Sequence, residues 1–157
     1  MSAKPLDDLA VGLKTYATSH YDTYLTAVET GSTDGITLPD LEEREYGYKE
    51  VLGRKAYPVG VFVPGAIRIE PGASQGDIVT VDEAVILAVT DNTPDTLAKK
   101  LVRYVDAFRA MIAADETLGG LCVLARIESV ELYPAAQGAH DLAVAVVNVA
   151  MMTEVAT

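Results

Sequence analysis

Apolar residues recur at steps of three and four in two stretches of the chain, and this spacing predicts two amphipathic helices. The first runs from residue 5 to about residue 29, and its apolar stripe contains Leu6, Leu9, Leu13, Tyr16, Ala17, His20, Tyr24, Ala27 and Val28. The second runs from residue 94 to about residue 114, with Leu97, Leu101, Tyr104, Val105, Phe108 and Ile112 on its stripe. Thr93 stands at the N-cap position of this helix, and Pro94 suits its first turn. Each helix has one face to bury.

The rest of the chain alternates with the period of a β-strand. Strands are predicted at residues 57–63, 66–70, 78–90, 121–133 and 142–155, with the first two read as parts of one pairing. The last two are separated by a polar loop, so they should be antiparallel neighbours. The final strand is apolar on both faces, which predicts that it is central in the sheet or covered at an interface.

These elements predict an α+β fold, with a mixed, largely antiparallel sheet of about four strands and two helices packed on it. No linker or internal repeat divides residues 1–157, so we expect one domain. Residues 31–56 are acidic and interrupted by glycine, and their secondary structure is not predicted. We expect this segment and the loop 71–77 to protrude and to make contacts with other subunits.

The chain is strongly acidic, with 12 basic against 23 acidic residues and a net charge of −11. Such a chain is a poor candidate for gripping nucleic acid, although an acidic wall past which DNA slides fits the charge. No apolar run has the length of a membrane span, and no secretory signal is readable at the N-terminus. We therefore expect no membrane partner.

Motifs for catalysis or cofactor binding are not found in the sequence. The glycines of residues 31–35 and 119–120 do not join a strand to a helix, as a phosphate-binding loop requires. His20 and His140 are the only histidines and lie in no metal-binding arrangement. Cys122 is the only cysteine and lies in an apolar run, so we expect a buried, inert thiol. The sequence predicts no catalytic residue, no cofactor-binding residue and no metal ligand.

Acidic pairs are abundant, but each has a simple structural explanation as a helix-dipole complement, a solvated loop or a strand edge. They are Asp7 with Asp8, Glu42 with Glu43, Asp115 with Glu116, and Glu128 with Glu131. Tyrosine is enriched, with eight residues against two phenylalanines. Because tyrosine is common both at core edges and at protein interfaces, both roles stay open.

The order of these elements resembles that of the tail-terminator and tail-completion proteins of long-tailed bacteriophages. The resemblance is carried by the strand beginning Tyr57-Pro58-Val59-Gly60-Val61, by Leu101-Val102-Arg103-Tyr104-Val105-Asp106-Ala107-Phe108-Arg109, and by the turn Asp115-Glu116-Thr117-Leu118-Gly119-Gly120. It implies a structural virion protein that forms a ring, typically of six copies, on the head-proximal end of the tail tube. Its expected partners are further copies of itself, the tail tube protein and a neck or head-completion protein. DNA would pass only as cargo, and assembly would take place in the host cytoplasm.

Three alternatives stay open at this stage. A head-completion or stopper protein of the phage neck has a similar size and order of elements. A small cytoplasmic α+β enzyme would use a tyrosine or carboxylate in a pocket between the first helix and the sheet, with carboxylates of raised pKa. An oligomeric adaptor from outside phages is the third.

Overall fold

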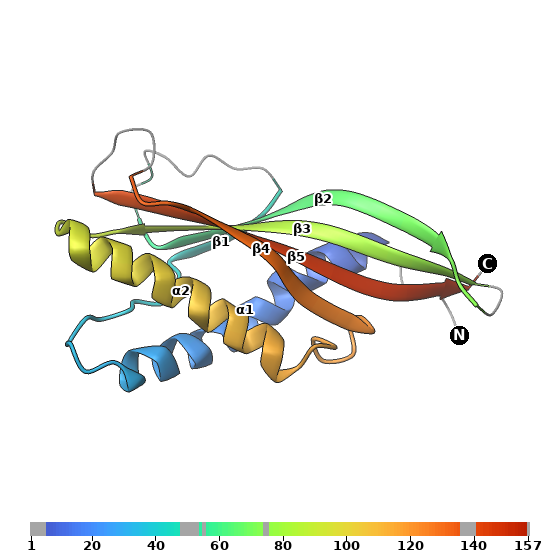
Figure 1. Cartoon of the computed structure of the whole chain (residues 1–157), viewed down its shortest axis with the longest axis horizontal. Helices are drawn as coiled ribbons and strands as arrows, with labels where there is room; N and C mark the ends of the chain where they lie inside the picture. Colours follow the sequence, from blue (N-terminus) through green and yellow to red (C-terminus); the bar gives the residue numbers. More distant parts are fainter. Residues whose placement is uncertain (1–5, 48–53, 55, 74–75, 136–140, 157) are drawn as a thin grey trace.

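A computed structural model describes residues 6–47, 54, 56–73, 76–135 and 141–156. The chain forms α1 (Leu6–Gly31), β1 (Glu43–Tyr46), β2 (Val59–Pro71), β3 (Gly76–Thr90), α2 (Pro94–Ala114), β4 (Leu124–Tyr133) and β5 (Leu142–Ala156). The five strands make one sheet in the order β1-β2-β3-β5-β4. Both helices pack on the same side of this sheet (Figure 1). The predicted α+β class is confirmed, with β1 as a strand that the sequence pattern did not reveal.

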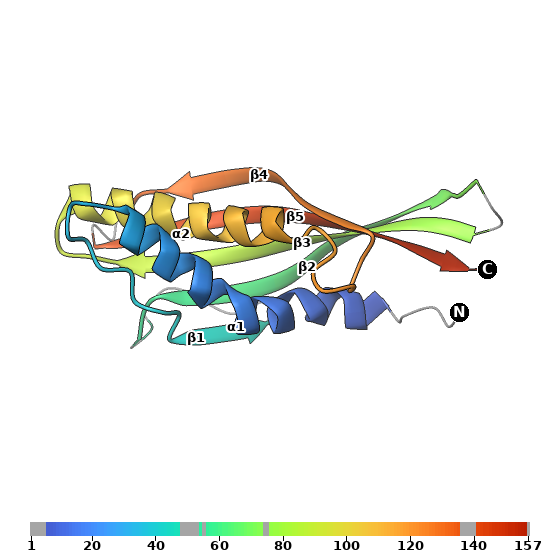
Figure 2. The same ribbon diagram turned by 90° about the horizontal axis from the view of Figure 1, so that it is seen from below.

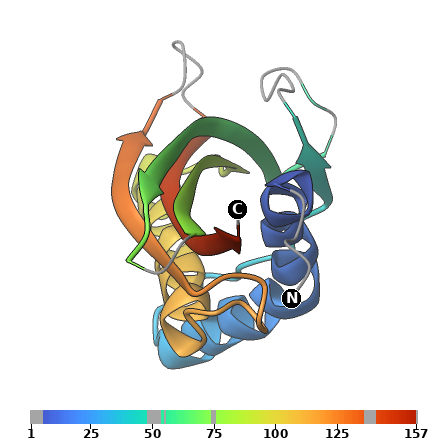
Figure 3. The ribbon, with the colours of Figure 1, turned by 90° about the vertical axis from the view of Figure 1, so that its right-hand side faces the viewer.

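The sheet is antiparallel except at one edge, where β1 pairs parallel to β2. β2 pairs with β3, β3 with β5 and β5 with β4, all antiparallel. The predicted pairing of residues 57–63 and 66–70 with a single partner is confirmed, because β2 continues through a bulge between Pro64 and Ile67. Viewed along its long axis, the sheet curls strongly (Figure 3).

The main core lies between the helices and the sheet. It contains the buried stripes of both helices and alternate residues of β3 and β5, among them Leu13, Leu25, Val85, Leu87, Leu101, Phe108, Val147 and Met151. A second, small cluster on the other face of the sheet joins Ala88, Leu142 and Val144 with Tyr57. Of the two predicted possibilities for the final strand, central in the sheet or covered at an interface, the structure shows the first, because β5 lies between β3 and β4. Tyr57 of the same chain covers part of its second face.

The expectation that residues 31–56 protrude is wrong for residues 31–47. Leu38 and Leu41 are buried, at 4% and 5% exposure. The backbone N–H of Leu38 donates to Glu29 over 2.5 Å, and Arg103 of α2 bonds Asp34 over 2.5 Å. The two buried leucines and these polar contacts hold the segment against the helices. Packing there removes the leucine side chains from water, which is favourable. Residues 48–53 and 55 lie outside the described residues.

The segment that does project is an arm made by the distal halves of β2 and β3. Its hydrogen-bonded part beyond the bulge pairs Ile67 with Val81 and Pro71 with Asp77. The arm reaches past the ends of both helices, accompanied by the end of β5 (Figure 2). The described ends of loop 71–77 therefore lie at the tip, as expected.

Thr93 corrects a smaller expectation. It occupies the N-cap position of α2 with an extended backbone, but its side chain makes no capping hydrogen bond. Instead the side chain of Asp91 accepts a 2.9 Å hydrogen bond from the backbone N–H of Thr93, and Lys100 pairs with the same carboxylate over 3.0 Å.

Candidate functional site

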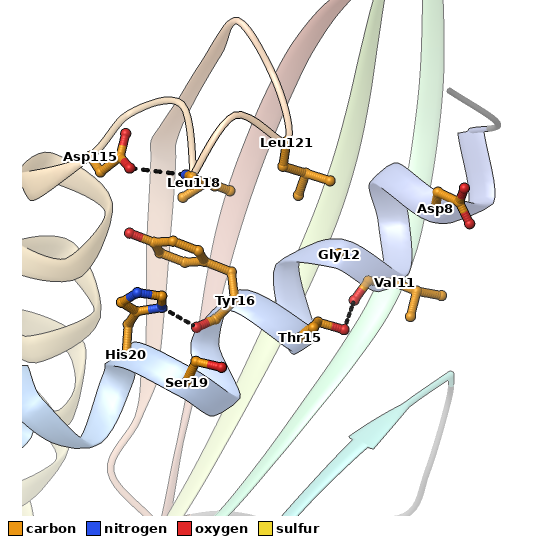
Figure 4. A pocket seen from close by; sticks show the side chains of 11 residues that line it. Asp8, Val11, Gly12, Thr15, Tyr16, Ser19, His20, Asp115, Leu118 and Leu121 are labelled. Carbon is orange, nitrogen blue, oxygen red and sulfur yellow. Dashed lines mark hydrogen bonds between the residues drawn. The ribbon is translucent and has the colours of Figure 1, made fainter. Parts of the chain in front are cut away.

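A shallow groove of about 590 Å³ lies between α1 and the turn that follows α2 (Figure 4). Its walls mix polar and apolar side chains: Asp8, Val11, Thr15, Tyr16, Ser19 and His20 from α1, and Asp115, Leu118 and Leu121 from the turn. Gly12 keeps α1 close to this turn, because a Cβ built there would lie 2.6 Å from both terminal carbons of Leu121. This groove is the natural place to test the expectation that the protein has no catalytic residues.

His20 is committed to a local structural role in this groove. Its ring stacks on the ring of Tyr16, with centroids 4.1 Å apart, and its Nδ1 lies 2.9 Å from the backbone oxygen of Tyr16. His20 was placed on the apolar stripe of the first helix by its spacing, but its side chain is exposed. Ser19 is the preceding residue of the helix, and side chains of consecutive helical residues do not face each other. The groove therefore does not present a serine activated by a histidine.

Asp115 is likewise occupied by the turn. Its carboxylate accepts hydrogen bonds from the hydroxyl of Thr117 (2.7 Å), the backbone N–H of Thr117 (3.0 Å) and that of Gly119 (2.9 Å). The bond from the Thr117 hydroxyl, followed by those from the two amides, lowers the pKa of Asp115. Burial, followed by the charge of Asp115, raises the pKa of Tyr16. With its pKa lowered, Asp115 is a weak base, and with its pKa raised, Tyr16 is a weak acid. The two side chains are therefore poor partners for proton transfer at neutral pH.

In the other acidic pairs of the sequence, individual carboxylates contact a basic or hydroxyl side chain or lie at a helix start. Glu43 is paired with Arg54 over 2.5 Å, Glu128 lies near Arg68 and Arg126, and Glu131 accepts a 2.7 Å hydrogen bond from the Tyr133 hydroxyl. Asp7 and Asp8 lie in the first turn of α1, as expected. Within the described residues, no group of three or more histidines, cysteines and carboxylates could hold a metal ion.

The two remaining sequence candidates have different outcomes. Cys122 is buried, and its Sγ lies 3.7 Å from the backbone oxygens of Glu116 and Thr117, so the predicted burial is confirmed. His140 lies outside the described residues.

Glu83 is the unusual residue that the sequence analysis missed. It lies in β3 on the helix-facing side, between Val81 and Val85, and is only 1% exposed. Neither of its carboxylate oxygens has a hydrogen-bond partner among the described residues. Burial raises its pKa to about 8, so it is mostly protonated at neutral pH. The sequence did contain a signal for this residue, because Glu83 is the one acid among apolar residues at the alternate positions 79, 81, 85, 87 and 89.

Glu83 also marks the root of the arm. Its pairing partners are Pro64, where the bulge of β2 begins, and Val149 of β5. Because it does not line the groove, it supplies no acid there.

Exposed apolar side chains lie on two edge strands as well as in the groove, where Val11 is 39% exposed. Ile67 and Ile69 of the arm are 52% and 62% exposed, and Val130 and Leu132 of β4 are 37% and 47% exposed. Exposed apolar residues on unpaired strand edges are typical of contacts with another chain.

Comparison with known proteins assigns no family. No model of a known protein family matches the chain, and no curated protein matches it. Neither described helix is long and apolar enough to cross a membrane.

Proposed function

We propose that this chain is a structural virion protein that forms a ring on the head-proximal end of a phage tail tube and joins the tube to the neck. The observation that carries the proposal is the projecting arm with its exposed Ile67 and Ile69. Apolar side chains at these exposures, on an element that leaves the body of its own domain, favour burial against another subunit. The order of elements that resembles tail terminators supports the same reading.

The groove supports a structural rather than an enzymatic role. An enzyme of the alternative class needs a concave pocket with carboxylates of raised pKa. In the groove, the pKa of Asp115 is lowered. The carboxyl group whose pKa is raised, that of Glu83, is buried outside the groove. We therefore propose that the protein is not an enzyme.

The charge of the chain suits a ring through which DNA passes. A subunit with net charge −11 repels the phosphate backbone, so DNA could slide through without being held. The proposed partners are thus further copies of the chain, the tail tube protein and a neck protein, in a virion assembled in the host cytoplasm. A membrane has no part in the proposal.

Light scattering tests this function directly. The purified protein is measured alone and after mixing with the tail tube protein of the same phage. We expect a discrete species of about six copies, formed alone or on adding tube protein. A monomer that ignores tube protein would refute the terminator role. Binding to the portal-side adaptor instead would identify a head-completion or stopper protein.

A further inference from the structure

The sheet ends in two edges that have no strand partner among the described residues. On one side, β1 covers only Val59–Phe62 of β2, so residues 63–71 of β2 have a free outer edge. On the other side, β4 is the last strand and pairs only with β5. A free strand edge presents unpaired N–H and C=O groups, which are a template for pairing with another chain.

The strand directions allow these two edges to pair with each other between copies. Along the sheet, β2, β3, β5 and β4 alternate in direction, so β4 runs opposite to β2. When a second copy continues the sheet in the same orientation, its β2 therefore meets β4 of the first copy antiparallel. Pro64 and Pro71 lack an N–H and bracket the usable part of β2, residues 65–70.

The exposed apolar side chains of both edges lie on the same face of the sheet. Ile67 and Ile69 are paired with Val81 and Val79, which belong to the core beneath the helices. Val130 and Leu132 are paired in the same way with Val147 and Ala145, which belong to the same core. In a continuous sheet, all four exposed side chains would thus be on the helix-facing side.

One register matches both the apolar and the charged positions. With Ile67 opposite Leu132, the alternation places Ile69 opposite Val130 and Arg68 opposite Glu131. Arg68 and Glu131 lie on the other face, and opposite charges directly across an antiparallel pair attract. Arg68 is 51% exposed although it contacts two carboxylates of its own chain, Asp82 over 2.9 Å and Glu128 over 3.7 Å, so part of its side chain stays open to water. Glu131 is exposed and is bonded only by Tyr133 among the described residues.

We propose that residues 65–70 of β2 in one copy form an antiparallel ladder with β4 of a second copy, in the register that places Ile67 opposite Leu132. The contact joins two different surfaces, so it is head-to-tail, and repetition produces a ring if the rotation closes. This inference rests on the ring function proposed above and names the surfaces that build the ring.

Cysteine cross-linking between two different chains tests the ladder. Ile69→Cys is made in one chain and Val130→Cys in another, because Cα atoms of opposite residues in an antiparallel pair lie about 4.5–5.5 Å apart, within the range of a disulfide. Under mild oxidation, we expect a covalent dimer of the mixture and little from either chain alone. Val123→Cys is the matched control, since Val123 is 54% exposed and precedes β4. Equal cross-linking of Ile69→Cys with Val123→Cys, or none with Val130→Cys, would overturn the ladder.

Charge reversal tests the register. Arg68→Glu in the chain with Ile69→Cys should slow cross-linking roughly fivefold, because it sets two carboxylates opposite each other. Glu131→Arg in the partner chain should restore the rate. Arg126→Glu is the control, because Arg126 also contacts Glu128, over 3.5 Å, but lies outside the ladder. If Arg68 and Glu131 do not meet, the cross-linking rate would be unchanged by Arg68→Glu, by its combination with Glu131→Arg and by Arg126→Glu. That result would overturn the proposed register.

The two proposals fail in different ways. A ring that forms with tube protein but gives no Ile69–Val130 cross-link keeps the terminator function and excludes the ladder. A specific cross-link in a protein that ignores tube protein keeps the ladder and excludes the terminator function.

Discussion

The hydroxyl of Tyr21 in α1 donates a 2.7 Å hydrogen bond to the backbone oxygen of Tyr104 in α2, and both side chains are buried. The hydroxyl of Tyr104 in turn donates to the backbone oxygen of Pro39. Two tyrosines thus connect α1, α2 and the segment that follows α1. Each hydroxyl thus has a carbonyl partner although its ring is buried, which explains why tyrosine rather than phenylalanine occupies these core positions.

Replacing Tyr21 by Phe should lower the free energy of unfolding by about 1–2 kcal/mol, because a buried hydrogen bond is lost while the ring still packs. Urea unfolding followed by circular dichroism measures the change. Tyr133→Phe is the control, since that hydroxyl bonds an exposed glutamate and its loss should cost less than about 0.5 kcal/mol. Equal effects of the two substitutions would contradict the role of the buried bond.

Glu83 should make stability fall as the pH rises. The folded-state pKa is raised from 4.5 to about 8, so the folded protein holds one more proton than the unfolded chain between these values. Its contribution is therefore complete below about pH 4.5 and is lost as the pH rises through about 8. The slope from this group is at most about 1.4 kcal/mol per pH unit.

Glu83→Gln should remove this slope, which unfolding curves at about pH 6 and about pH 8 would measure. Glu70→Gln, at an exposed position of the arm, should leave the pH dependence as it is. Glu83→Leu should stabilise the protein at both pH values, because it replaces an unpartnered polar group by an apolar one. Identical pH profiles of the wild type and Glu83→Gln would refute this account.

Leu41 should matter for folding and Leu132 for assembly. Leu41→Ala opens a cavity in the core and should cost about 2–4 kcal/mol in unfolding free energy. Leu132→Ala, at an exposed position of β4, should cost less than about 1 kcal/mol and should weaken the self-association seen by light scattering. A stable Leu41→Ala variant would mean that residues 31–47 are dispensable to the fold.

Gly120 should contribute to stability through its backbone conformation and not through a lack of space for a side chain. Its φ is +88°, and a Cβ added there would meet no atom within 4 Å. Gly120→Ala should therefore cost about 1–2 kcal/mol from backbone strain without any clash. Gly31 has equal space but ends α1 without a positive φ, so Gly31→Ala should be neutral or slightly stabilising. Thermal unfolding of both variants makes the comparison, and equal melting temperatures would contradict it.

The sequence by itself determined which segments become helices and long strands. The three-and-four spacing around Leu101 and Phe108 predicts α2, and the alternation through Leu87 predicts β3, because each pattern directly records which face of an element is buried. The absence of catalytic motifs was likewise a prediction made from the residues alone.

Only the tertiary structure decided what lies against those elements. The four residues of β1 are too few for their alternation to predict a strand, and they form a strand only by pairing with β2. Glu83 has an ordinary place in its own strand and becomes exceptional because it is buried between β2 and β5, where no described residue offers its carboxyl a hydrogen bond. The exposure of Ile67 and Ile69 likewise depends on the arm reaching past both helices (Figure 2). In each case the deciding contacts join residues far apart in the sequence, and local periodicity carries no information about such contacts.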